Sequence, residues 1–168
     1  MHPDIAAKQT LTDRTLVLGV GNVLLTDDGV GVHVIRALEL AGFAGPDVAL
    51  RDGGTIGLAL LSELVESGRL IAVDAMELHE APGTVRVFEG AQMDAQLRGR
   101  KRTAHEVALA DLVMAAELAG SAPARRALVA IQPGSTGWGL APCADVAAAV
   151  PKACAAVQTL IEEWNRGR

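Results

Sequence analysis

The sequence has few cysteines, no excess of basic charge and no long hydrophobic run, and each absence excludes a class of protein. The two cysteines, Cys143 and Cys154, lie eleven residues apart, too far for a disulfide along one continuous helix. Their spacing matches neither a zinc site nor a CxxC redox pair. We therefore expect reduced, packed thiols in a cytosolic protein.

Basic residues are outnumbered, with 15 Lys and Arg against 20 Asp and Glu, for a net charge of −5. This balance argues against a nucleic-acid-binding surface. The basic cluster at residues 98–102 is expected to be a solvated loop, although it could also steer an acidic or C-terminal segment of a partner. The N-terminus, MHPDIAAKQTLTDR, lacks the apolar region of a signal peptide, and no run approaches about eighteen apolar residues. We expect no membrane contact, a cytoplasmic location and a flexible extension over residues 1–14.

Half of the 168 residues are hydrophobic, which is typical of a single domain with one core, here residues 15–168.

A short strand at 84–88 follows the preceding strand too closely for a helical crossover, so it should be antiparallel and near an edge. Pro151 should kink the last helix or mark its start. The order of elements predicts an α/β fold with a doubly wound, mainly parallel, five-stranded twisted sheet, one antiparallel strand and helices on both faces. The other expected strands are 15–20, 48–51, 70–73 and 128–131, and the expected helices are 30–42, 55–66, 103–118 and 144–164.

Residues 15–31, TLVLGVGNVLLTDDGVG, combine a buried strand, a glycine turn and a helix that begins with two acids. A dinucleotide fingerprint would need glycine in place of Leu24, and the Gly-Lys-Ser/Thr ending of a phosphate loop is absent, so we do not expect phosphate binding. Asp27 could simply cap the helix and complement its dipole. Asp28 is better explained as an oxygen ligand or general base, because open α/β sheets place their sites at the carboxyl ends of strands.

Two further acids come at the ends of predicted strands. Asp52 precedes Gly53, Gly54 and Thr55, where a turn-forming hydrogen bond to the following amides is a better explanation than catalysis. Asp74 ends the uninterrupted aliphatic strand 70–73, where a carboxylate has few structural explanations, so a functional role is favoured. If the first and third strands flank the switch point of the sheet, Asp28 and Asp74 face one crevice.

His105 lies in the sequence Thr103-Ala104-His105-Glu106, which is typical of a capping box at the start of a helix. The positive end of the helix dipole disfavours imidazolium, and a neutral imidazole is the form that binds a metal. A merely exposed or hydrogen-bonded histidine is the alternative. No HExxH motif accompanies it.

Taken in order, five features resemble the maturation endopeptidases of [NiFe] hydrogenases: GVGNVLLTDDGVGV at 19–32, DGGT at 52–55, Asp74, APGT at 81–84 and His105. The resemblance covers nearly the whole chain from Thr15 on. It implies a small, monomeric, cytosolic enzyme with a five-stranded sheet. Its expected substrate is the large-subunit precursor of a hydrogenase. Its expected reaction is removal of the C-terminal extension after nickel insertion, by a cut after a histidine or arginine near the cluster-binding cysteines.

The resemblance also implies that Asp28, Asp74 and His105 are metal ligands, at positions where some members have glutamate in place of Asp28. Two carboxylates and one imidazole suit nickel, although they would also suit zinc. We expect the nickel to be supplied by the substrate, and whether it activates water or serves only recognition stays open. No serine or cysteine nucleophile signature is present, so Asp52 or a bound water is the next candidate for the general base.

Two other functions compete with this one. Paired acids after the first strand, together with Asp74, also resemble a receiver-like phosphoacceptor domain that binds magnesium. That domain needs a lysine after the last strand, where this chain has Gln132 and Pro133, and it leaves His105 unexplained. A nickel-binding chaperone without hydrolytic activity is the second alternative.

Overall fold

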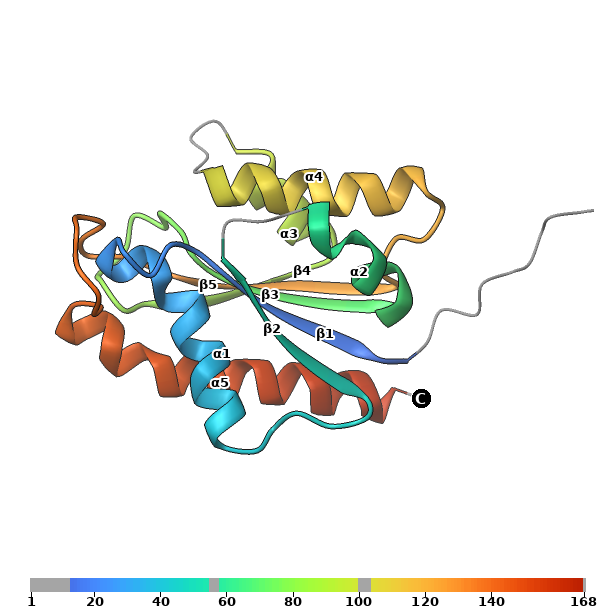
Figure 1. Ribbon diagram of the computed structural model, residues 1–168, viewed down its shortest axis with the longest axis horizontal. Coiled ribbons are helices and arrows are strands. Elements are labelled where there is room, and N and C mark those ends of the chain that lie inside the picture. The colour runs from blue at the N-terminus through green and yellow to red at the C-terminus, as the bar shows by residue number, and fades with distance from the viewer. Residues whose placement is uncertain (1–12, 55–57, 100–103, 168) are drawn as a thin grey trace, which may run out of the picture.

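The computed structural model describes residues 13–54, 58–99 and 104–167, which form a five-stranded sheet with helices on both faces (Figure 1). The expected flexible extension falls almost entirely outside these residues, and so do Thr55 at the start of the predicted helix 55–66, the capping residue Thr103 and most of the basic cluster. Asp13 is described, and its carboxylate pairs with Arg69 at 2.9 Å.

The sheet has the order β2-β1-β3-β5-β4, which confirms the predicted mixed architecture. β1 pairs in parallel with β2 and β3, and β3 pairs in parallel with β5. β4 runs antiparallel to β5 at the edge, as its short connection to β3 requires. β1 and β3 are buried along their whole length. The strand bounds are β1 (Thr15–Val20), β2 (Val48–Gly54), β3 (Arg69–Ala75), β4 (Val85–Glu89) and β5 (Arg125–Ile131).

Helices cover the sheet in two layers (Figure 1). One face is covered by α1 (Val30–Leu40) and α5 (Ala144–Arg166), and the other by α2 (Leu61–Ser67), α3 (Ala91–Leu97) and α4 (Ala104–Leu118). Two 3-10 turns, η1 (Thr26–Gly29) and η2 (Leu58–Leu60), precede α1 and α2. The short helix α3 was not predicted, because seven residues carry too little periodicity to distinguish a helix from a loop.

Alternation along the strands divides the core into two layers. Val17 and Val129 point toward α1 and α5, whereas Leu16 and Leu128 point toward the other three helices. By length and composition alone, α5 could cross a membrane. Within the fold, however, its apolar stripe, including Trp164, packs in the core. α5 begins at Ala144 and continues through Pro151, so the proline does not mark its start.

Helix α1 approaches the sheet unusually closely because glycines face the contact. A Cβ atom on Gly31 would collide with the backbone oxygens of Val20 and Val73, and one on Gly19 would collide with the carbonyl of Gly31. Since these obstacles are backbone atoms, a side chain could enter only by displacing the helix. This close contact holds the segment before α1 against the ends of β1 and β3.

Candidate active site

Asp28 lies in η1, between the end of β1 and the start of α1, and its side chain is almost fully buried. Its Oδ2 atom accepts a hydrogen bond from the backbone N–H of Asn22 at 3.0 Å. Burial by itself would raise the pKa of Asp28, but the hydrogen bonds from His105 and Asn22 outweigh it, so the pKa is lowered. Asp28 is therefore an ionised acceptor whose position is set by the turn after β1.

His105 is the second residue of α4, and it reaches Asp28 from the opposite layer of the structure. Its Nε2 atom lies 2.8 Å from Asp28 Oδ2, and both side chains are almost completely buried. The hydrogen bond to Asp28 raises the pKa of His105, aided by the charges of Asp74, Asp28 and Glu106, although burial opposes the shift. The carboxylates around His105 thus shift its pKa in the direction opposite to the one expected from the helix dipole.

Asp74 lies within β3 and not after it, because β3 continues its ladder with β5 through Ala75. Its carboxyl group is completely buried, and neither oxygen has a hydrogen-bond partner among the described residues. Burial raises the pKa of Asp74 to about 8, with further contributions from the charges of Glu106 and Asp28, while the charge of His105 and the backbone amide of Ala75 act in the opposite direction. A buried acid without partners is costly for folding, and such groups cluster at functional sites.

Glu106 is a further acid beside the site that sequence reasoning assigned only to a helix cap. Its side chain is buried, and its charge acts on both Asp74 and His105. The capping-box spacing was the only signal at this position, and burial beside Asp74 depends on how α4 packs over β3.

Asp52 does not join this group. It lies at the end of β2, about half exposed, where Oδ1 accepts a hydrogen bond from the Gly54 amide at 3.0 Å and Oδ2 lies 3.8 Å from Arg36. This is the turn-forming contact that the sequence favoured for Asp52.

Asp27 has a different role from the helix cap that we considered. No side-chain hydrogen bond caps η1 or α1. Instead, the buried Asp27 carboxylate accepts hydrogen bonds from the backbone amides of Gly134 (2.7 Å), Ser135 (2.8 Å) and Cys143 (2.6 Å), and from the Cys143 thiol (3.1 Å). Burial would raise the pKa of Asp27, but these hydrogen bonds lower it. Asp27 thus fixes the loop between β5 and α5, which is distant in sequence.

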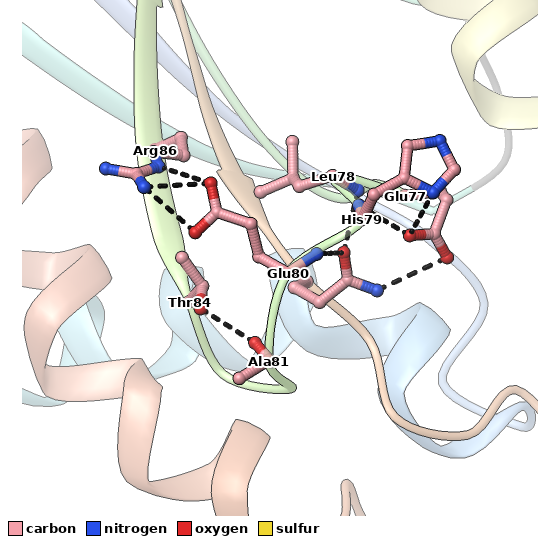
Figure 2. Close-up of polar contacts among 8 residues, drawn as sticks. Glu77, Leu78, His79, Glu80, Ala81, Thr84 and Arg86 are labelled. Carbon is pink, nitrogen blue, oxygen red and sulfur yellow. Dashed lines mark hydrogen bonds and ion pairs between the residues drawn. The ribbon is translucent and has the colours of Figure 1, made fainter.

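The loop between β3 and β4 borders the same end of the sheet, and Figure 2 shows its polar contacts. The buried Gln132 accepts hydrogen bonds from the backbone N–H groups of Leu78 (2.7 Å) and Glu80 (3.4 Å). Arg86 donates two hydrogen bonds to Glu80, at 2.8 and 2.9 Å. Gln132, which sequence reasoning noted only as a missing lysine, therefore holds this loop in place.

The site has suitable donors for a metal but no preformed metal cage. Within the described ranges, no three His, Cys, Asp or Glu side chains are grouped so that they could hold an ion. The oxygens of Asp74 and the Nδ1 atom of His105 are buried without a partner, while Asp28 and His105 Nε2 bond to each other. Two carboxylates and an imidazole are a donor set that borderline divalent metals accept. The types of donor atom therefore suit such a metal, although Asp28 and His105 are hydrogen-bonded to each other and the three side chains are not grouped around one position.

An α/β sheet with buried carboxylates and a histidine at the carboxyl ends of its central strands defines a candidate hydrolase site. Residues 32–160 match the family model described as hydrogenase maturation protease. The chain is 38% identical over 123 residues to the hydrogenase 2 maturation protease of Escherichia coli K12, covering 73% of this chain and 74% of that protein. It is 33% identical over 153 residues to the hydrogenase expression/formation protein HupD of Rhizobium leguminosarum bv. viciae, covering 90% and 76%.

Solved structures agree with these sequence matches. The hydrogenase-maturating endopeptidase HybD from E. coli superimposes with a TM-score of 0.82 at 33% identity, covering 89% of this chain and 93% of that one. The [NiFe] hydrogenase maturation protease HybD from Thermococcus kodakarensis gives a TM-score of 0.75 at 26% identity, covering 88% and 99%. This chain belongs to the hydrogenase maturation protease family, and the resemblance inferred from its motifs is confirmed.

Proposed function

We propose that this peptidase removes the C-terminal extension of a [NiFe] hydrogenase large-subunit precursor after nickel insertion, and that it recognises the nickel held by that substrate. The observation that supports this proposal best is the buried group formed by Asp28, Asp74 and His105. Asp74 carries two oxygens without partners, and His105 carries one such nitrogen. These unsatisfied atoms are the ones that an incoming ion would bind.

Each residue of the group has a distinct part in the proposal. Asp28 orients His105 through the 2.8 Å contact, and the carboxylate of Asp28 itself stays ionised. His105 donates its Nε2 proton to Asp28, and the unpartnered Nδ1 atom has to be free of a proton before it can bind a metal. Asp74 holds a proton near neutral pH and supplies oxygen ligands once it is released. Nickel brought by the substrate would add Lewis-acid character at the bond to be cut.

A three-donor cage is absent among the described residues, which suits a metal that arrives with the substrate. Cleavage would then depend on nickel in the precursor, because the substrate would supply the remaining ligands of the nickel. We further infer that the enzyme acts as a monomer in the cytoplasm.

Asp52 remains our candidate for a general base, acting on a water molecule from outside the buried group. Its exposure would give it access to water. Replacement by asparagine keeps the hydrogen bond to Gly54 available and removes only the charge. We expect Asp52→Asn to retain the fold and to lower the cleavage rate by about a hundredfold if Asp52 is the base.

The two alternatives differ in support. The receiver-like function is disfavoured because Gln132 occupies the place of the required lysine and forms hydrogen bonds with Leu78, Glu80 and Glu77 of the β3–β4 loop. Nickel binding without hydrolysis would use the same residues, so only an activity measurement separates it from proteolysis.

The test is to incubate the purified enzyme with nickel-loaded and nickel-free large-subunit precursor and to weigh the products by mass spectrometry. We expect loss of a C-terminal peptide only from the nickel-loaded precursor. His105→Ala should lower the rate by about a hundredfold or more, whereas His33→Ala, a change on α1 outside the Asp28 group, should not. An uncut, nickel-loaded cognate precursor would favour the nickel-binding chaperone.

A further inference from the structure

Three exposed apolar side chains gather on two loops beside the candidate site. Leu24 follows β1 and is 48% exposed, and Trp138 and Leu140 follow β5 and are 85% and 74% exposed. In Figure 1 both loops lie at the end of the sheet from which α1 and α5 begin. We call these three side chains the apolar ridge.

The two loops are bonded into one unit. Gly139 donates its N–H to the Leu24 carbonyl at 3.0 Å, and Thr26 donates its N–H to the Gly139 carbonyl at 2.9 Å. The Thr26 hydroxyl also lies 3.1 Å from the Gly137 carbonyl. Both chain neighbours of Trp138 are thus attached to the segment that leads into Asp28.

The carboxylate of Asp27 also holds the two loops together. It accepts the amides of Gly134 and Ser135 at the start of the β5–α5 loop and the amide of Cys143 at its end. Because Asp27 directly precedes Asp28, one short segment holds both the ridge and a residue of the site. Trp138 is therefore exposed to solvent on a backbone that is already ordered, which lowers the entropy cost of using it in binding.

The surroundings of the ridge indicate what kind of partner it fits. Residues 19–35 and 127–151 contain no lysine or arginine, so the two segments that form the ridge do not themselves carry the charges that attract anionic lipid or nucleic acid. Three side chains are also too few for a stable homodimer, which buries roughly 1,200 Å² or more, whereas a transient contact between enzyme and substrate can be smaller. An exposed tryptophan on a hydrogen-bonded backbone, with exposed leucines on the same two loops, is typical of an anchor that enters an apolar pocket of another folded protein.

We propose that the apolar ridge docks onto an apolar patch of the folded large-subunit precursor and thereby positions the scissile segment at Asp28 and His105. This inference rests on the proposed function. The ridge would bind the body of the substrate, while the buried group acts on the segment to be removed.

The kinetic test compares a ridge variant, Trp138→Ala with Leu140→Ser, with a control that removes equally exposed leucines elsewhere. Leu118, 84% exposed at the end of α4, and Leu40, 91% exposed at the end of α1, provide that control as Leu118→Ser with Leu40→Ser. On nickel-loaded precursor we expect the ridge variant to raise KM about tenfold or more with kcat changed less than about threefold. The control should stay within about twofold of wild type.

A direct binding test uses the fact that the chain has two tryptophans. In enzyme labelled with 5-fluorotryptophan and inactivated by His105→Ala, Trp164 is 3% exposed and serves as an internal reference. Addition of unlabelled precursor should shift or broaden the fluorine signal of Trp138 and leave that of Trp164 unchanged. A Trp138 signal that responds to anionic phospholipid vesicles or to enzyme concentration, and not to precursor, would overturn the proposal.

The outcomes separate the two proposals. If wild-type enzyme cleaves the precursor and the ridge variant matches it in KM, the docking role is wrong while the proposed function stands. If wild-type enzyme cleaves no nickel-loaded cognate precursor, the proposed function fails and the docking role fails with it. Equal thermal unfolding of the ridge variant and wild type would exclude misfolding as the cause of a raised KM.

Discussion

At the scale of single residues, Asp74 is an unfavourable group for folding. It is fully buried without a hydrogen-bond partner among the described residues, and its pKa is about 8 against an ordinary value of 3.8. Between these two pH values the folded protein keeps a proton that the unfolded chain releases. The contribution of Asp74 to the stability of the metal-free protein should therefore become less favourable as pH rises from about 4 to about 8.

We expect Asp74→Asn to remove this dependence and to make the metal-free protein more stable at pH 8 by an amount on the order of a few kcal/mol. The variant should be inactive as a peptidase, so its gain in stability would come with a loss of function. Urea unfolding of chelator-treated protein at pH 5, 7 and 9 measures both effects. Identical pH profiles for the variant and wild type would show that Asp74 does not carry the shift.

At the scale of elements, the contact between α1 and the sheet decides where Asp28 lies. Gly31→Ala tests it, because two effects of opposite sign compete there. Alanine is the better helix former by about 1 kcal/mol, but its Cβ would meet backbone oxygens of Val20 and Val73, which cannot rotate away. We expect the collision to dominate and to destabilise the protein by about 1 to 3 kcal/mol.

Gly45→Ala is the matched control, since a Cβ atom there meets nothing within 4 Å. Its free energy of unfolding should stay within about 0.5 kcal/mol of wild type. Urea denaturation of both variants gives the comparison. Peptidase activity should fall only for Gly31→Ala, because a displaced α1 would also move the adjoining η1, which contains Asp28. A Gly31→Ala protein as stable as the control would contradict the close contact.

At the scale of the whole molecule, the two core layers share one sheet, so residues 15–168 should unfold as one domain. Trp138→Ala leaves Trp164, in the layer of α1 and α5, as the sole tryptophan. Its fluorescence should follow the same urea transition as far-ultraviolet circular dichroism, which reports on all helices. Separate midpoints would show that the two layers unfold independently.

Much of the fold could be predicted because local patterns carry it. Aliphatic runs and, for β4, alternation of apolar residues with Arg86 predicted all five strands, and the short link before β4 predicted its antiparallel direction. Boundaries were less accurate, since β3 and β5 extend beyond their aliphatic centres through backbone pairing that includes Arg69 and Arg125. Helix α3 was missed because it is only seven residues long.

Sequence by itself determined the family, the order of the elements and the residue types at the ends of β1 and β3. Only the tertiary structure decided how those residues are used. The contact between Asp28 and His105, the isolation of Asp74 and the loop-holding role of Asp27 all join segments far apart in the chain. Burial, partner choice and protonation depend on what surrounds a side chain in space, and sequence spacing does not report that beyond a few residues.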